Sequence, residues 1–185
     1  MQATRGTPLT SGQPVTDRSP GSSRHRLLFA VVAVTAYLVD LVTNLLAVRH
    51  LTEGHPVDVI GGLLRFDLVR NPGAAFSTGT SYTLILSVIA LLAAAVVVRF
   101  GRRLGDRTWA IALGLLLAGV CGNLTDRIFR DPGVLRGHVI DFFELPHWPV
   151  FNVADMLIDA AVVLILVQSW RGVRLTGAAG DDRTP

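Results

Sequence analysis

Four apolar runs constrain this chain more than any other feature. They occupy Leu27–Val48, Tyr82–Phe100, Trp109–Val120 with its flanks, and Val150–Trp170. A helix needs about 20 apolar residues to cross a bilayer, and only the third run depends on its flanks for that length. Of the 185 residues, 50% are hydrophobic and 17% charged, whereas a soluble domain carries about 25% charged residues. We therefore predict an all-α membrane protein with four transmembrane helices.

Arginines at the ends of these runs predict the orientation in the membrane. The chain has no lysine, so its formal charge of +3 comes from arginine. One set of flanks holds Arg24, Arg26, Arg99, Arg102, Arg103, Arg107, Arg171 and Arg174. The positive-inside rule then places both termini in the cytoplasm. We expect no nucleic-acid binding, because the arginines adjoin apolar runs and form no basic stripe with aromatic residues.

The chain divides into two tails and one membrane domain. Residues 1–25 are rich in Pro, Gly, Ser and Thr and predict a disordered cytoplasmic tail; residues 172–185 predict a second one. Residues 26–171 form the membrane domain. The first run is too long for the 7–15 residues of a signal-peptide core, so we expect it to remain as an anchor.

The first outer loop predicts a small extracytoplasmic β-element. Residues 57–69 alternate polar and apolar side chains around Gly61-Gly62, a pattern typical of a hairpin with a two-residue turn. Asn71-Pro72-Gly73 follows and is a strong turn signal. We therefore expect a short antiparallel pair on the outer membrane surface.

Two carboxylates lie where the last span meets the outer face. Asp141 is in the preceding loop, and Asp155 lies just inside the run that starts at Val150. Two neighbouring carboxylates cannot both ionise cheaply, so a pair can share a proton and supply both a general base and a general acid. The alternative is that Asp141 is a simple loop residue and Asp155 a first-turn residue favoured by the helix dipole.

Four motifs together resemble one family. They are "NPGAAFS" (71–77), "GVCGNLTDR" (119–127), "GHVIDFF" (137–143) and "FNVADM" (151–156). Each motif lies at a predicted membrane boundary. The motifs and their order resemble those of the lipoprotein signal peptidases, also called signal peptidase II. The resemblance extends from about Arg26 to Trp170.

The resemblance implies an aspartic endopeptidase of the bacterial cytoplasmic (inner) membrane. Such an enzyme cleaves prolipoprotein signal peptides before a diacylglyceryl-modified cysteine. It implies that Asp141 and Asp155 are catalytic near the extracytoplasmic face, and that Asp126 is not part of the pair. The implied supporting or substrate-binding residues are Asn71, Gly73, Gly119, Gly122, Asn123, Arg127, Asn152, Ala154 and Asp40.

The chain departs from the family pattern in two places. Where the family usually has "DQxxK", this chain has Asp40 followed by Leu41 and Asn44, so the lysine is missing. Asp40 itself matches, and we expect it to support structure within the first span. Asp159, four residues after Asp155, stands where an apolar or small residue is more usual; it is assigned no catalytic role.

Other chemistry is less well supported by the sequence. His138 and His147 lack the second ligand pair of a metal site, so we expect no metal and no other cofactor. Cys121 has no activating base near it in the sequence, so we expect its thiol to be buried and inert. We expect a monomer that contacts membrane lipid and lipid-modified prolipoproteins. The rival function is a small proton-coupled carrier with Asp40, Asp155 and Asp159 as a relay.

Overall fold

Four helices and a three-stranded sheet make up the part of the chain that the computed structural model describes, residues 20–73 and 81–177. In order they are α1 (Pro20–His50), β1 (Val57–Ile60), β2 (Leu64–Asn71), α2 (Ser81–Gly101), α3 (Arg107–Phe129), β3 (Val139–Glu144) and α4 (Val153–Trp170). All four helices are long and apolar enough to cross a membrane. The predicted all-α membrane fold with a small β-element is confirmed.

The ends of the helices differ from the predicted boundaries. α1 begins at Pro20, so residues 20–25 are helical instead of belonging to the predicted tail. Residues 1–19 and 178–185 of the predicted tails lie outside the described residues. After α4 the chain folds back, because Val173 O accepts a hydrogen bond from Trp109 Nε1 and Leu175 O accepts one from Gly105 N. Residues 172–177 are therefore ordered against the α2–α3 connection.

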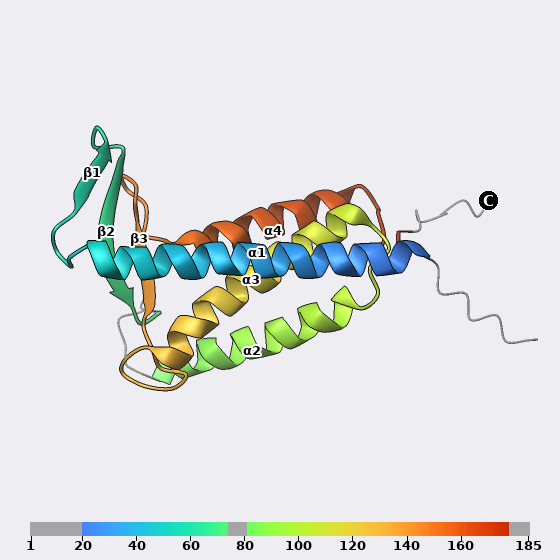
Figure 1. Cartoon of the computed structure of the whole chain (residues 1–185), viewed down its shortest axis with the longest axis horizontal. Helices are drawn as coiled ribbons and strands as arrows, with labels where there is room; N and C mark the ends of the chain where they lie inside the picture. The colour runs from blue at the N-terminus through green and yellow to red at the C-terminus, as the bar shows by residue number, and fades with distance from the viewer. Residues whose placement is uncertain (1–19, 74–80, 178–185) are drawn as a thin grey trace, which may run out of the picture.

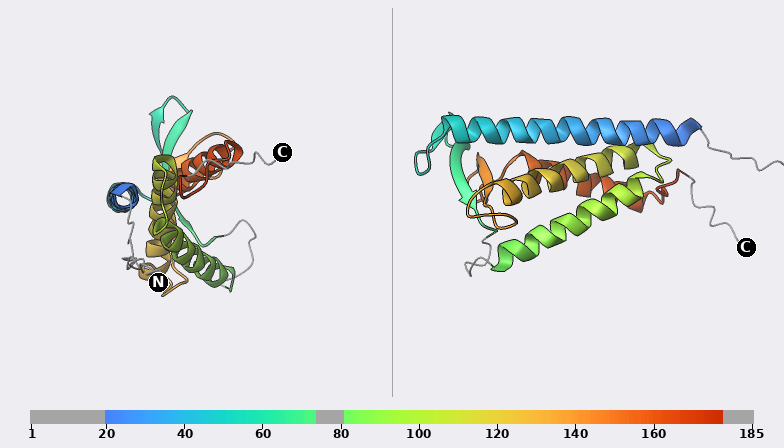
Figure 2. Two further views of the ribbon diagram at one scale, coloured as in Figure 1. Left: turned by 90° about the vertical axis from the view of Figure 1, so that its right-hand side faces the viewer. Right: turned by 60° about the horizontal axis from the view of Figure 1, so that its bottom comes forward.

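α3 is the central helix of the bundle. It lies between α1 on one side and α2 and α4 on the other (Figure 2), and it packs against all three. In the most apolar stretch of each helix, half of the residues are buried in α3, compared with 22% in α1 and 17% in both α2 and α4. The outer surfaces of the other helices carry exposed apolar side chains such as Val31, Leu38 and Leu92. This arrangement fits a bilayer, whose acyl chains are as apolar as leucine.

Small residues bring α3 and α4 into close contact. A Cβ on Gly119 would overlap the carbonyl oxygen of Ala154 and lie 2.7 Å from Ile158 Cγ1. A Cβ on Gly122 would overlap a carboxylate oxygen of Asp40 on α1. In membranes, such small residues let backbones approach and gain van der Waals contact. The two glycines thus draw three helices together at one level.

The sheet has the order β1-β2-β3 and is antiparallel throughout. It lies at one end of the helices, opposite the end at which α1 begins and α4 finishes (Figure 1). The hairpin is confirmed, but its two-residue turn is wrong. Ile60 pairs with Leu64, so Gly61, Gly62 and Leu63 form the connection, and both glycines have positive φ.

β3 is a strand that the sequence reading treated as loop. Residues Val139 to Phe142 are all buried, so the run shows no alternation of polar and apolar side chains. β2 pairs with it through Val69 opposite Asp141 and Asn71 opposite Val139. Phe142, Ile140 and Leu68 pack with Ala47 of α1 in one apolar cluster. The strand therefore places Asp141 at the sheet end of the bundle.

We expect Gly119→Leu to lower the stability of the folded protein by about 1–3 kcal/mol, because the added side chain overpacks the contact with Ala154. Thermal unfolding in detergent measures the change. Ala160→Leu adds the same side chain on the exposed side of α4 and serves as the control. Equal unfolding temperatures for the two variants would contradict the close-packing argument.

Candidate active site

Asp141 is buried in the middle of β3. Its residue surface is 1% exposed. Oδ2 accepts a hydrogen bond of 2.8 Å from Asn71 Nδ2, and Oδ1 accepts one of 2.8 Å from Asn152 Nδ2. Two side-chain amides thus fix the plane of the carboxyl group. Both donors come from predicted site residues.

Asp155 lies in the first turn of α4, as its third residue. The helix begins at Val153, so Asp155 is closer to the helix end than a start at Val150 implies. Its Oδ1 accepts 2.9 Å from Asn123 Nδ2 on α3, and its Oδ2 accepts 3.3 Å from Asn152 N. The side chain is half-buried. A negative charge here is favoured by the dipole of α4.

Asn152 connects the two carboxyl groups. It is the N-cap of α4, and its Oδ1 accepts 2.9 Å from Asp155 N, which completes a reciprocal capping box. Its Nδ2 donates to Asp141 Oδ1, to Ile140 O at 3.1 Å and to Asn123 Oδ1 at 3.1 Å. Asn152 is fully buried. As the N-cap, Asn152 precedes the first helical residue, so it does not share a helix face with Asp155.

Burial raises the pKa of Asp141 from 3.8 to about 7. The amide donors of Asn71 and Asn152 oppose the rise by stabilising the ionised form, and the negative charges of Asp155 and Asp126 add to it. The charge of Asp155 thus acts in the same direction as burial and favours the neutral form of Asp141. Asp141 is thus predisposed to hold a proton near neutral pH.

Asp40 supports the start of α4 from a neighbouring helix. Its Oδ1 accepts 2.8 Å from Ala154 N, one of the amides left without an intrahelical partner at a helix start. Asn44 Nδ2 donates to Asp40 Oδ2 at 3.4 Å, so the residue in place of the family lysine retains a weak contact. Asn44 Oδ1 is buried without a partner among the described residues. The role of Asp40 thus extends beyond α1 itself.

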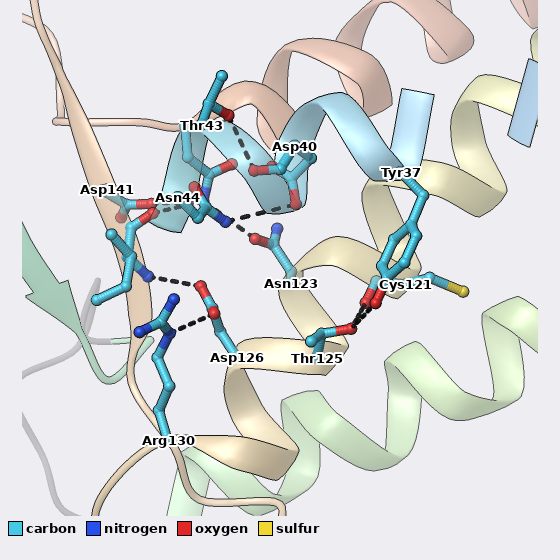
Figure 3. Close-up of polar contacts among 12 residues, drawn as sticks. Tyr37, Asp40, Thr43, Asn44, Cys121, Asn123, Thr125, Asp126, Arg130 and Asp141 are labelled. Carbon is cyan, nitrogen blue, oxygen red and sulfur yellow. Dashed lines mark hydrogen bonds and ion pairs between the residues drawn. The ribbon is translucent and has the colours of Figure 1, made fainter. Parts of the chain in front are cut away.

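Asp126 joins α3 to β3, a role that the sequence did not indicate (Figure 3). Its Oδ2 accepts 3.0 Å from Ile140 N, and its Oδ1 pairs with Arg130 Nε. The arginine that pairs with this carboxylate is Arg130. The spacing of four residues between Asp126 and Arg130 was the one feature of the sequence that could have predicted this ion pair.

Arg127 and the turn after β2 lie beside the aspartates. Gly73 has φ +90°, and its N–H donates 2.8 Å to Asn71 Oδ1. A Cβ on Gly73 would lie 3.6 Å from both Nη1 and Nη2 of Arg127. Arg127 Nη1 is buried and has no hydrogen-bond partner in the described part of the chain. Residues 74–77 of the "NPGAAFS" motif lie outside the described residues.

Two further residues lie away from this group. Asp159 is exposed on α4, on the opposite side from the residues that face α3. Cys121 was predicted to be buried but is half-buried. It lines an apolar pocket of about 390 Å³ between α1 and α3, together with Tyr37 and Thr125. Neither residue touches the aspartate pair through a hydrogen bond in the described chain.

Comparison with known proteins gives consistent results. A family model described as "Signal peptidase (SPase) II" matches residues 32–171. The lipoprotein signal peptidase of Mycolicibacterium smegmatis is 49% identical over 173 residues, covering 88% of this chain and 73% of the relative. That of Streptomyces coelicolor is 47% identical over 166 residues, covering 90% and 81%. A solved bacterial membrane enzyme is 26% identical with a TM-score of 0.69, covering 76% of this chain and 91% of that one.

We expect the pH dependence of stability to report the raised pKa of Asp141. The unfolded carboxyl ionises near 3.8 and the folded one near 7, so the folded state binds more protons between these values. The free energy of unfolding of the wild type therefore falls as pH rises through this window, by up to about 4 kcal/mol relative to Asp141→Asn. Thermal unfolding at pH 4 and pH 8 measures it.

The exposed surface carboxylate of Asp58 provides the control. Asp58→Asn should leave the difference between pH 4 and pH 8 close to that of the wild type. If the stabilities of the wild type and Asp141→Asn differed by the same amount at both pH values, the pKa of Asp141 would not be raised.

Proposed function

The chain belongs to the signal peptidase II family, and from this premise we propose that Asp141 and Asp155 are its catalytic pair. It is a multi-pass membrane aspartic endopeptidase that removes signal peptides from prolipoproteins. The observation that carries the assignment is the position of Asn152 between the two carboxyl groups. Its side-chain amide donates to Asp141, and its backbone N–H donates to Asp155. Both carboxyl groups are thereby held beside one residue.

We assign the shared proton of the free enzyme to Asp141 and the negative charge to Asp155. Asp141 is the more buried of the two, and desolvation favours its neutral form. Asp155 accepts a backbone N–H at the positive end of α4, which favours a carboxylate. The two environments thus separate the roles, as in other acid–base pairs of carboxyl groups.

The reaction then proceeds by addition of water to the peptide carbonyl. Asp155 takes a proton from the water, whose oxygen bonds to the carbonyl carbon of the residue before the modified cysteine. Asp141 gives its proton to the carbonyl oxygen as the tetrahedral intermediate forms. Asp155 next protonates the leaving nitrogen, the C–N bond breaks, and Asp141 recovers its proton from the intermediate's hydroxyl group. Both aspartates end in their starting states.

Arg127, with Asn71 beside it, is proposed to hold the substrate backbone. The buried Nη1 of Arg127 lacks a partner in the described chain, and a buried donor without an acceptor costs about 1–3 kcal/mol. A peptide carbonyl would supply that acceptor. A Cβ on Gly73 would lie 2.6 Å from Leu86 Cδ1, so only glycine fits where this turn passes the guanidinium group of Arg127. Asn123 and Asn152 orient the aspartates.

We place the catalytic pair near the extracytoplasmic face, with both termini cytoplasmic. The sheet end of the bundle, which holds Asp141 and Asp155, is opposite the arginines of the α2–α3 connection (Figure 1). We further propose a monomer in which residues 26–171 act as one domain. The substrate's acyl chains would remain in the surrounding bilayer lipid.

The carrier reading is not supported by the family comparison or by the positions of its residues. A proton relay needs groups that follow one another across the membrane. Asp40 is engaged with Ala154 N at the level of the active site, and Asp159 lies exposed on α4. No chain of ionisable groups among the described residues continues from them to the other face.

We expect Asp141→Asn and Asp155→Asn each to reduce cleavage of a diacylglyceryl-modified prolipoprotein by about 10³-fold or more, because each removes one half of the acid–base pair. A gel-shift assay in detergent follows the loss of the signal peptide. Asp131→Asn, an exposed carboxylate between α3 and β3, should retain activity. Cleavage by either folded site variant at the wild-type rate would remove that aspartate from the proposal.

We expect single cysteines to label from opposite sides of the membrane. In a Cys121→Ala background, Asp131→Cys should react with a membrane-impermeant maleimide on intact cells. Arg102→Cys, in the α2–α3 connection, should react only after the membrane is opened. Both positions are exposed, so access alone decides the result. The reverse pattern would invert the proposed topology.

A further inference from the structure

The end of the bundle opposite the sheet carries a cluster of exposed arginines. The α2–α3 connection and the residues after α4 both lie at this end (Figure 1). Among the described residues, no carboxylate forms an ion pair with any of these arginines. Their one side-chain hydrogen bond within the described chain runs from Arg171 Nη1 to Gln168 Oε1 at 3.4 Å. The arginine cluster consists of Arg99, Arg102, Arg103, Arg107, Arg171 and Arg174.

Acidic side chains in the same segments do not balance this cluster. Asp106 is the only acidic residue in 97–114, and residues 160–177 contain none. Asp106 Oδ1 accepts 2.9 Å from Trp109 N as the cap of α3, and it accepts 2.8 Å from Gln168 Nε2 of α4. The one carboxylate of this region thus joins two helices, and the arginines leave a strong positive field at this end.

The fold brings the two segments of the arginine cluster into contact. Gly105 N donates 2.9 Å to Leu175 O, and a Cβ on Gly105 would overlap the backbone of the segment after α4. Arg103 and Arg107 each lie two residues from Gly105, and Arg174 precedes Leu175. Membrane orientation depends on the number of arginines in each segment and not on contact between segments. Because like charges repel, this contact favours an anion that both segments share.

Exposed aromatic residues place the arginine cluster at the membrane interface. Trp170 is 91% exposed and precedes Arg171, and Phe100 is 48% exposed and follows Arg99. Tryptophan is enriched where the bilayer meets water. An arginine at this level extends its apolar stem along the membrane and keeps its guanidinium group among the polar headgroups. The charged groups therefore lie at the depth of the lipid phosphates.

A lipid phosphate is the anion that fits this position. Guanidinium groups bind phosphate oxygens through two parallel N–H donors, and basic clusters beside a membrane span attract anionic lipids. We propose that the arginine cluster binds the phosphate groups of anionic phospholipids in the leaflet that it faces, which is the cytoplasmic one in the orientation given above. A phosphate that contacts both segments holds the chain after α4 against the start of α3. This site lies at the opposite end of the bundle from the catalytic pair.

Fluorescence quenching tests the preference for anionic lipid. The chain has three tryptophans, and Trp148→Phe leaves Trp109 and Trp170, both at the arginine end. Phosphatidylglycerol or phosphatidylcholine with brominated acyl chains is added at equal mole fractions to phosphatidylcholine nanodiscs that contain this protein. We expect brominated phosphatidylglycerol to quench more strongly. Arg103→Gln with Arg174→Gln should lower the relative association constant of phosphatidylglycerol about tenfold.

The matched control removes two exposed arginines from the sheet end, Arg49 and Arg136. Arg49→Gln with Arg136→Gln should leave the quenching by both lipids unchanged. Raising the salt concentration to about 0.5 M should reduce the preference of the wild type, because the arginines are exposed and their charges are screened. Asp141→Asn should keep the wild-type preference, since its carboxyl group lies at the other end of the bundle.

Thermal unfolding measures the effect of the lipid on stability. A ligand that binds only the folded state raises the unfolding temperature. We expect the wild type to unfold about 3 °C or more higher in detergent micelles with phosphatidylglycerol than in micelles with phosphatidylcholine. Arg103→Gln with Arg174→Gln should lose most of this difference. Inorganic phosphate at the same concentration should give no such shift, because it has no acyl chains that hold it at the membrane.

The outcomes separate the lipid site from the proposed function. Equal quenching by the two brominated lipids, or an unchanged preference in Arg103→Gln with Arg174→Gln, overturns the lipid site. Equal stabilisation by inorganic phosphate assigns the arginine cluster to a free anion and also overturns it. A normal lipid preference in a wild-type protein that does not cleave prolipoprotein overturns the proposed function alone.

Discussion

The start of α4 depends on the cap that Asn152 provides, and the candidate site depends on the start of α4. A helix end buried in a membrane protein has free N–H groups that water cannot satisfy. Asn152 Oδ1 takes the N–H of Asp155, and Asp40 takes that of Ala154. The same Asn152 side chain donates to Asp141. One requirement of helix termination therefore also determines how the two candidate catalytic carboxyl groups are held.

The carboxylates near this helix end have different tasks because their surroundings differ. Asp40 and Asp126 each accept a backbone N–H from another element, and both are almost fully buried. They join α1 to α4 and α3 to β3. The hydrogen bonds described for Asp141 come from the side-chain amides of Asn71 and Asn152, and Asp155 accepts one from Asn123 beside the backbone N–H of Asn152. Amides fix a carboxyl group in place without supplying a positive charge that would lock it in the ionised form.

The four spans, the hairpin and the motifs around the aspartates could be predicted, because apolar run length and turn residues are local signals. β3 could not, since burial of consecutive residues from Val139 to Phe142 removes the alternation that reveals a strand. The role of Asn152 as the N-cap of α4 could not be predicted either, because the apolar run from Val150 does not show that the helix begins at Val153. The pairing of Asp126 with Ile140 N joins segments that only the fold brings together.

The edge of β3 that faces away from β2 is already occupied. Ile140 N donates to Asp126, Ile140 O accepts from Asn152, and the N–H groups of Phe142 and Phe143 donate to Phe151 O. A peptide therefore cannot extend the sheet by pairing along this stretch, as ligands do on open sheet edges. Inhibitors that imitate an added β-strand would find no ladder here. Compounds that present carbonyl groups to Arg127 and a polar group to the aspartate pair are the better starting point.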